Sequence, residues 1–155
     1  MKKLFLLSLI LFATPLFAQL NVISQQEKVE KIGMLRSTYA YVFAQGTDYY
    51  LGIRSSNQFD DTCLFCLGGT ASSSIMTARD LIKVANSLEV NASVVVTDAR
   101  GVKAQLIKKK IVGQPYLDIL LDGQAGTSNI TVAELEKAID IIKKHSGVQE
   151  GNIHN

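Results

Sequence analysis

Two cysteines separated by two residues have a spacing that could support redox or metal chemistry. Cys63 and Cys66 form a C-x-x-C motif, which in redox enzymes stands at a helix N-terminus where the dipole lowers a thiol pKa. Here both lie in the strand-like run TCLFCL (62–67), whose alternation places them on opposite faces about 10 Å apart. We therefore predict buried structural cysteines. A disulfide across a locally turned backbone, and thiol or metal chemistry, remain alternatives.

Histidine is scarce in this 155-residue chain, which weakens the case for zinc and hydrolase sites. The two histidines, His145 and His154, both lie near the C-terminal end. A zinc site needs more ligands than two cysteines, and Ser-His-Asp or Cys-His catalysis needs an imidazole held in a structured pocket. No G-x-S-x-G, H-E-x-x-H or P-loop pattern is present. We predict a non-enzymatic protein without metal or cofactor; the alternative is a thiol-active enzyme using Cys63 and Cys66.

A serine-rich loop is a candidate anion site. Ser72, Ser73 and Ser74 belong to GGTASSS (68–74), which leads into an apolar-periodic stretch and so offers amide donors and hydroxyls at a helix N-terminus. Such donors can hold a phosphate or a carboxylate. Neither this loop nor GQAGTS (123–128) contains lysine or arginine, which favours an ordinary strand-to-helix turn.

Two amphipathic helices are predicted to follow these loops. Thr77 stands three residues before Asp80, and Thr131 three before Glu134, which is the spacing of an N-terminal capping box. Apolar residues then recur at helical spacing in both stretches. These residues are Leu81, Val84, Ala85 and Leu88 in the first stretch, and Leu135, Ala138, Ile139 and Ile142 in the second.

Before each predicted helix the hydrophobic period changes to two, which indicates strands. Six runs qualify: LRSTYAYVFA (35–44), YYLGIRS (49–55), TCLFCL (62–67), SVVVT (93–97), VKAQLIKKKIV (102–112) and YLDILL (116–121). The lysine run 108–110 is typical of a protected sheet edge. Segment 25–33 is ambiguous, and a short helix ended by Gly33 is one option.

The two halves of the chain are similar at a period of 54 residues. The stretch starting at Thr62 aligns without a gap with the stretch starting at Tyr116, with six identities. Each half reads strand-strand-strand-helix, over about 34–88 and 92–145; two unrelated passages with the same capping pattern are the alternative. We predict an α+β two-layer sandwich with an antiparallel sheet of about six strands and two helices on one face, built as a tandem βββα pseudo-repeat.

The N-terminal eighteen residues have the features of a signal peptide. Lys2 and Lys3 precede an apolar run, and Ala18 supplies a small residue at the expected cleavage point. The run is short for a membrane span, so we expect a periplasmic or secreted protein without a stable membrane anchor after cleavage. The predicted divisions are a signal peptide (1–18), an N-terminal segment (19–33), a single domain (34–147) and a flexible tail (148–155).

The charge balance argues against nucleic acid as a partner. Removal of residues 1–18 takes two lysines away and leaves 14 basic and 14 acidic side chains. Aromatic residues concentrate between Tyr39 and Tyr50, and the element order is similar to that of Pur-alpha and whirly-type nucleic-acid-binding proteins. The aromatic residues and the lysine run 108–110 could form a stacking platform for single-stranded nucleic acid or sugar, but a neutral exported chain without a basic stripe is unsuited to nucleic acid.

One face of the predicted sheet has no helix to cover it. Leu117, Ile119 and Leu121 should face the helices, so their strand neighbours face away. Soluble monomers seldom leave a large apolar surface exposed, so we predict an interaction face for a protein partner or a second copy, giving a homodimer. A carrier of a small apolar ligand is an alternative, as is coverage by the N-terminal segment. The predicted face contains Leu64, Cys66, Tyr116, Leu120, Tyr39 and Tyr41.

Overall fold

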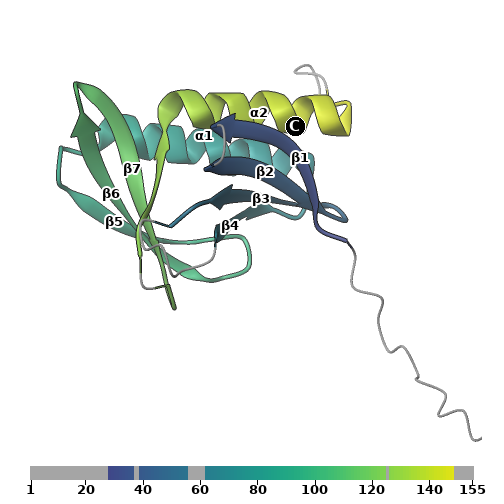
Figure 1. Cartoon of the computed structure of the whole chain (residues 1–155), viewed down its shortest axis with the longest axis horizontal. Helices are drawn as coiled ribbons and strands as arrows, with labels where there is room; N and C mark the ends of the chain where they lie inside the picture. Colours follow the sequence, from purple (N-terminus) through teal and green to yellow (C-terminus); the bar gives the residue numbers. More distant parts are fainter. Residues whose placement is uncertain (1–27, 37–38, 56–61, 125, 149–155) are drawn as a thin grey trace, which may run out of the picture.

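Figure 1 presents a computed structural model of the chain, which describes residues 28–36, 39–55, 62–124 and 126–148. Four strands and a helix are followed by four more strands and a second helix. The first set is β1 (Glu30–Arg36), β2 (Ala40–Gln45), β3 (Asp48–Ile53), β4 (Cys63–Gly68) and α1 (Ala71–Ser87). The second set is β5 (Ser93–Thr97), β6 (Lys103–Ile111), β7 (Gln114–Leu121), β8 (Ser128–Thr131) and α2 (Val132–Ser146). The predicted signal peptide and residues 149–155 of the predicted tail lie outside the described residues.

The strands form two antiparallel sheets of four, in the orders β1-β2-β3-β4 and β5-β6-β7-β8. The predicted α+β class with two helices is confirmed, whereas the single sheet of about six strands is wrong. Helix α1 follows β4 and leads into β5, which begins a new sheet instead of extending the first. Short turns fix which strands are neighbours, but they do not fix where one sheet ends.

Strands β1 and β8 differ from the elements that the sequence predicts. Within the predicted strand 35–44 the chain reverses, and Tyr39 N donates to Arg36 O (3.2 Å), so β1 begins upstream in the segment considered as a short helix. Strand β8 has four residues and immediately precedes α2, where the sequence predicts only a loop leading into that helix. Neither strand has a long alternating run of its own, so both depend on pairing with β2 and β7.

The element order repeats, but the 54-residue register matches only the later part of α1 with α2 and relates neither equivalent strands nor equivalent helix starts. It aligns β4 with β7, and Thr77 inside α1 with Thr131 at the N-cap of α2. Helix α1 begins at Ala71, because the Thr70 side chain accepts from Ser73 N and Ser73 completes the capping box. The capping box predicted at Thr77 is therefore wrong, and the one at Thr131 and Glu134 is confirmed.

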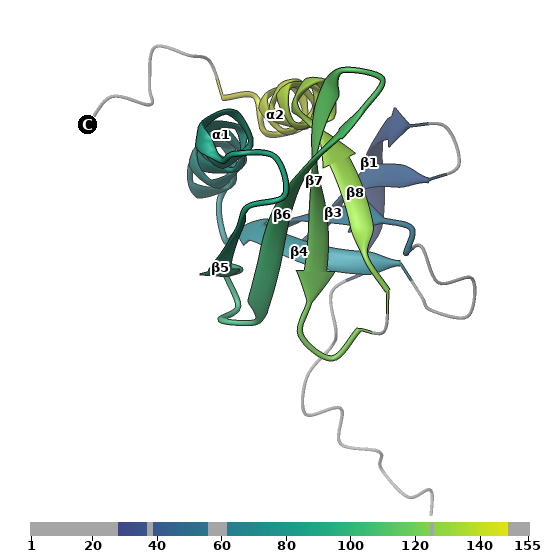
Figure 2. The same ribbon diagram turned by 90° about the vertical axis from the view of Figure 1, so that its left-hand side faces the viewer.

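Both helices lie side by side against the inner faces of the two sheets (Figures 1 and 2). Alternation places one set of residues from every strand inside, and this set is apolar except for the buried Lys108 on β6 and Ser128 on β8. Gly33 on β1 lies under α2, where an added Cβ would approach Ile141 to 2.6 Å. The largest fully buried side chains include Val42, Leu51, Phe65, Leu67, Ile75, Leu106, Leu117, Ile119, Ile130, Leu135 and Ile142. One core therefore serves both halves.

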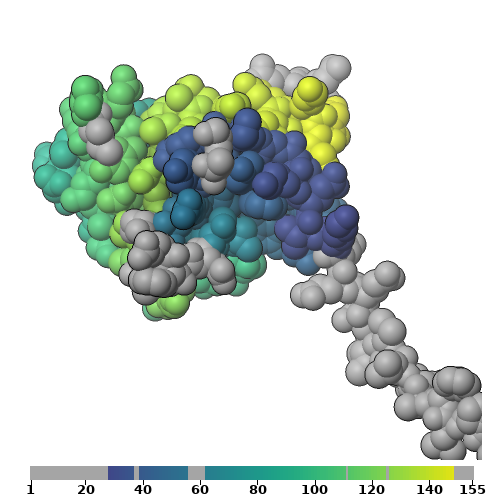
Figure 3. All heavy atoms as spheres, viewed as in Figure 1, coloured from purple at the N-terminus to yellow at the C-terminus, as the bar shows by residue number. Residues whose placement is uncertain are grey.

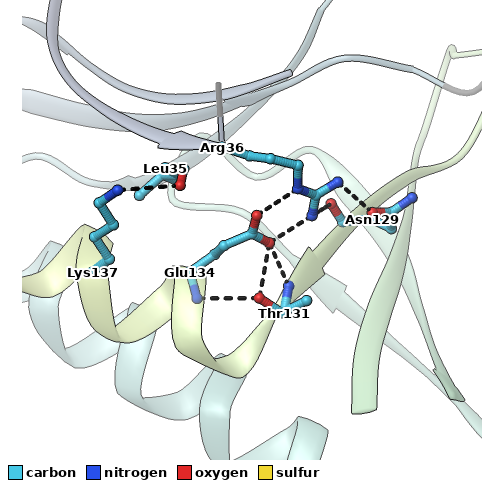
Figure 4. Close-up of polar contacts among 6 residues, drawn as sticks. All are labelled: Leu35, Arg36, Asn129, Thr131, Glu134 and Lys137. Carbon is cyan, nitrogen blue, oxygen red and sulfur yellow. Dashed lines mark hydrogen bonds and ion pairs between the residues drawn. The ribbon is translucent and has the colours of Figure 1, made fainter. Parts of the chain in front are cut away.

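Polar contacts also join the halves (Figure 4). Arg36 donates to Glu134 through Nε and Nη2, both at 2.6 Å, and through Nη1 to Asn129 Oδ1 at 2.9 Å. Glu134 also accepts from Thr131 N (2.8 Å) as part of the helix cap. Burial alone would raise the pKa of Glu134, but the hydrogen bonds from Arg36 and Thr131 lower it below its ordinary value.

The lysine run does not protect a sheet edge, because β6 lies between β5 and β7 inside the second sheet. Lys108 is buried and its Nζ donates to Asn86 O (3.3 Å), while Lys109 Nζ donates to Asn91 Oδ1 (3.1 Å). These two lysines anchor the connection between α1 and β5. Within the described ranges, neither helix has the length and apolar character needed to cross a membrane.

Candidate functional site

The residues of the predicted interaction face lie on two different sheets. Tyr41 belongs to β2, and Leu64 and Cys66 to β4, all in the first sheet; Tyr39 immediately precedes β2. Tyr116 and Leu120 belong to β7 in the second sheet. The structure thus separates a set that a single sheet would have brought together, and each sheet has its own helix-free face.

The helix-free face of the second sheet is mixed in character. Cross-strand rows place Gln105 beside Leu120, and Lys109 beside Tyr116. A shallow hollow of about 280 Å³ on this face, lined in part by Val95, Lys103 and Leu120, ends at the β7–β8 turn. Polar and charged side chains interrupt the apolar ones here, so no continuous apolar surface forms.

The helix-free face of the first sheet carries a continuous group of aromatic and apolar side chains. The strand register places Met34 beside Tyr41, Phe43 beside Tyr50, and Leu64 beside Gly52. We call this group, together with Lys31 beside Phe43, the aromatic face; its members are Lys31, Met34, Tyr41, Phe43, Tyr50 and Leu64. Atoms of β1 and β2, purple and blue in Figure 3, form much of the surface seen in that view.

Glycine and edge-to-face packing fix the rings of the aromatic face. The Tyr41 and Phe43 rings meet edge to face with centroids 6.1 Å apart. Phe43 lies across Gly52, where an added Cβ would come within 2.1 Å of its ring. Any larger residue at position 52 would displace the ring, so the glycine allows Phe43 to pack closely against β3.

Three cations lie over tyrosine rings on this side of the first sheet. Lys31 Nζ is 3.6 Å from the Tyr41 ring centroid and 6.0 Å from that of Phe43. The guanidinium carbons of Arg54 and Arg100 are 5.5 Å and 5.2 Å from the rings of Tyr39 and Tyr50, respectively. Cation–π attraction holds such groups in place, so the surface is aromatic and positively charged at once.

The β5–β6 turn covers the β4 side of the aromatic face. Cys66 N donates to Asp98 Oδ2 (3.1 Å), and Ala99 N donates to Cys66 O (3.1 Å). Arg100 Nη2 donates to Leu64 O (2.7 Å) while its guanidinium lies over Tyr50. Tyr50 and Cys66 are consequently only 7% and 2% exposed. The accessible part of the aromatic face lies toward β1 and β2, where Met34 is 51% exposed.

Both cysteines are free and buried. Burial raises the pKa of Cys63 to about 11; burial and, secondarily, the Asp98 carboxylate raise the pKa of Cys66. Both thiols are therefore protonated at neutral pH, and both lie within β4 and not at a helix N-terminus. This environment does not favour thiolate chemistry.

The serines of the candidate anion loop form the first turn of α1. Ser73 Oγ donates to Thr70 O (3.0 Å), and Ser74 Oγ donates to Gly68 O (3.2 Å) and Thr70 O (2.7 Å). Ser72 is exposed. These contacts use the Ser73 and Ser74 hydroxyls within the chain's own cap, so anion binding there stays a prediction. Among the described residues, no cluster of three or more His, Cys, Asp or Glu side chains could hold a metal ion.

The sequence did not point to two of the cations on this side of the first sheet. Lys31 lies in the ambiguous segment 25–33, and Arg100, which lies over Tyr50, comes between the predicted strands 93–97 and 102–112. The concentration of aromatic residues between Tyr39 and Tyr50 was the available signal. Comparison with protein-family models, with curated proteins and with solved structures gave no match to this chain.

Proposed function

We propose that this chain is a non-enzymatic binding protein that contacts an acidic segment of another protein through the aromatic face. The observation that carries the proposal is the continuous row of Met34, Tyr41 and Phe43 on a helix-free sheet face. Tyrosine, phenylalanine, methionine and cations are typical of the centres of protein interfaces.

The charges on this side of the sheet favour an acidic partner. Lys31, Arg54 and Arg100 all lie over rings there. Asp98 is buried beneath the turn, where it accepts from Cys66 N and pairs with the Arg100 guanidinium (3.1 Å), so Lys31 and Arg54 are the cations left to meet a partner. Carboxylates of a partner would meet the cations, and its apolar side chains would meet Met34 and the ring edges.

The same geometry favours a protein over a single-stranded nucleic acid. A stacked base needs an open ring face, and Lys31 Nζ occupies one over Tyr41 at 3.6 Å. Phe43 packs against Gly52 and against the Tyr41 ring, and Tyr50 is covered by Arg100. A protein side chain can contact ring edges and the lysine without displacing them.

Selection of peptides from a random displayed library on the purified protein tests this proposal. We expect enrichment of sequences that combine acidic and apolar residues. Titration of a selected peptide into the ¹⁵N-labelled protein should shift the amide signals of Lys31, Met34, Tyr41 and Phe43. Tyr41→Ser should weaken binding at least tenfold, whereas Leu120→Ser, a matched change on the second sheet, should leave it unchanged.

Two outcomes would contradict the proposal. Shifts confined to the second sheet would place the binding surface elsewhere. Tighter binding of a 12-nucleotide oligothymidylate than of any selected peptide, with shifts at Tyr41 and Phe43, would identify nucleic acid as the ligand of the aromatic face.

A further inference from the structure

In three of the four outer strands of the two sheets, a backbone carbonyl accepts a hydrogen bond from a neighbouring element. The outer strands are β1 and β4 in the first sheet and β5 and β8 in the second. On β4, Cys66 O accepts from Ala99 N. On β1, Leu35 O accepts from Lys137 Nζ (3.3 Å), and on β8, Asn129 O accepts from Arg36 Nη2 (3.4 Å). Strand β5 is the exception.

The outward backbone groups of β5 have no partner among the described residues. Asp98 N donates to Val102 O (2.8 Å) and Lys108 N donates to Ala92 O (3.1 Å), so even-numbered positions pair with β6. By alternation, Ser93, Val95 and Thr97 direct their N–H and C=O groups away from the sheet. No contact within the described part of the chain satisfies them.

Strand β5 also lacks the usual protection of an exposed edge. Its sequence, SVVVT, contains no charge and no proline, and its pairing with β6 runs without a bulge. Val95 at its centre is 66% exposed. An unprotected, β-branched edge of this kind pairs readily with another strand.

We propose that two copies of this chain pair through β5, antiparallel and edge to edge, with the two-fold axis at Val95. The strand is self-complementary in this register. Ser93 lies opposite Thr97 of the second copy, Val94 opposite Val96, and Val95 opposite Val95. Both polar pairs and all valine pairs are of the kinds that stabilise antiparallel sheets, and each outward pair exchanges two backbone hydrogen bonds.

A groove beside β5 supports the pairing. It has a volume of about 230 Å³ and lies between α1 and β5, with Leu81, Val84, Val96 and Leu106 in its lining. A two-fold axis perpendicular to the sheet keeps the inner faces of both copies on the same side. Val94 and Val96 of the second copy therefore lie on the groove side of the joined sheet and cover apolar surface there. The second sheets of the two copies become one continuous sheet.

Sedimentation equilibrium of the purified protein tests the pairing. We expect twice the chain mass at micromolar concentrations. Val95→Lys places like charges opposite each other at the axis. We expect the dissociation constant of the dimer to rise at least a hundredfold, so that the variant is a monomer. Met34→Lys, a matched change on the first sheet, should remain dimeric. A monomeric wild-type protein, or a Val95→Lys variant that remains dimeric, would overturn the proposal.

Amide hydrogen exchange provides a readout that needs no variant. In the wild-type protein the amides of Ser93, Val95 and Thr97 should be protected, and the protection should rise with protein concentration. Rapid exchange of these amides at all protein concentrations would show that the β5 edge is unpaired in the purified protein, and it would overturn self-pairing. The result is independent of the proposed function, because peptide binding at Tyr41 involves the other sheet.

Discussion

At the scale of single residues, the Arg36–Glu134 pair makes stability depend on pH in a defined direction. The pKa of Glu134 is lowered in the folded protein, so its contribution is complete above the ordinary glutamate pKa and is lost as the pH falls below it. Glu134→Gln should lower the free energy of unfolding by about 1–3 kcal/mol at pH 7, because Arg36 loses its charged partner. The loss should shrink toward pH 3.

Urea denaturation at pH 7 and at pH 3 measures this difference. Glu136→Gln is the matched control, since Glu136 is exposed on the same helix, and it should change stability little at either pH. An equal loss for Glu134→Gln at both pH values would contradict the role assigned to the ion pair.

Single residues also show what the sequence could and could not predict. Alternation placed Leu117 and Ile119 inside, and both are fully buried. It could not reveal that Cys66, on the outward side of β4, is covered by Asp98 and Arg100 from 32 and 34 positions further along the chain. Local patterning determines which way a side chain points, whereas contacts distant in sequence determine what covers it.

At the scale of elements, mutations can test where α1 begins. The sequence predicts an N-cap at Thr77, whereas the structure has it at Thr70. Thr70→Ala should destabilise the protein by about 1 kcal/mol, since the Thr70 side chain accepts from Ser73 N. Thr77→Ala should cost less, because the Thr77 hydroxyl only donates to Ser73 O within the helix. Thermal unfolding of both variants checks the order, and a larger loss for Thr77→Ala would contradict a helix start at Ala71.

The β5–β6 turn is a second element whose contribution can be measured. The Asp98 carboxylate accepts from the amides of Cys66, Arg100 and Val102. Asp98→Ala leaves these donors without a partner and should lower stability by about 2–3 kcal/mol. It should also uncover Cys66, so labelling of the native protein by a thiol reagent at pH 8 should become faster.

Asp122→Ala is the matched control for the turn, since Asp122 is an exposed residue after β7. It should leave thiol labelling slow. Unchanged labelling in Asp98→Ala would show that something other than the turn protects the Cys66 thiol.

At the scale of the whole molecule, the two halves are expected to unfold together. Four of the five tyrosines belong to the first half and the chain has no tryptophan, so tyrosine fluorescence reports mainly on the first half. Circular dichroism of the helices reports on both halves. Because α1 and α2 pack on one shared core, the two signals should change at the same urea concentration. Separate midpoints would indicate two independent units.

The division into two sheets could not be predicted from the sequence, because it depends on this shared core. Six alternating runs and two helices were recognisable, and they were sufficient for the α+β class. The weak strands β1 and β8 form only against β2 and β7, and α2 packs over Gly33 at the far end of the chain. Such long-range pairing leaves no periodic signal in either segment.

The cover that α2 gives to β1 has a consequence for the order in which the chain is made. A ribosome releases the N-terminal strand first, and 98 positions separate Arg36 from Glu134, its ion-pair partner. Until the last helix emerges, the nascent first half has an uncovered apolar surface and cannot complete its structure. The apolar side of β1 therefore gains its helix cover only when almost the whole chain has been made, and until then the nascent chain exposes a surface that favours aggregation.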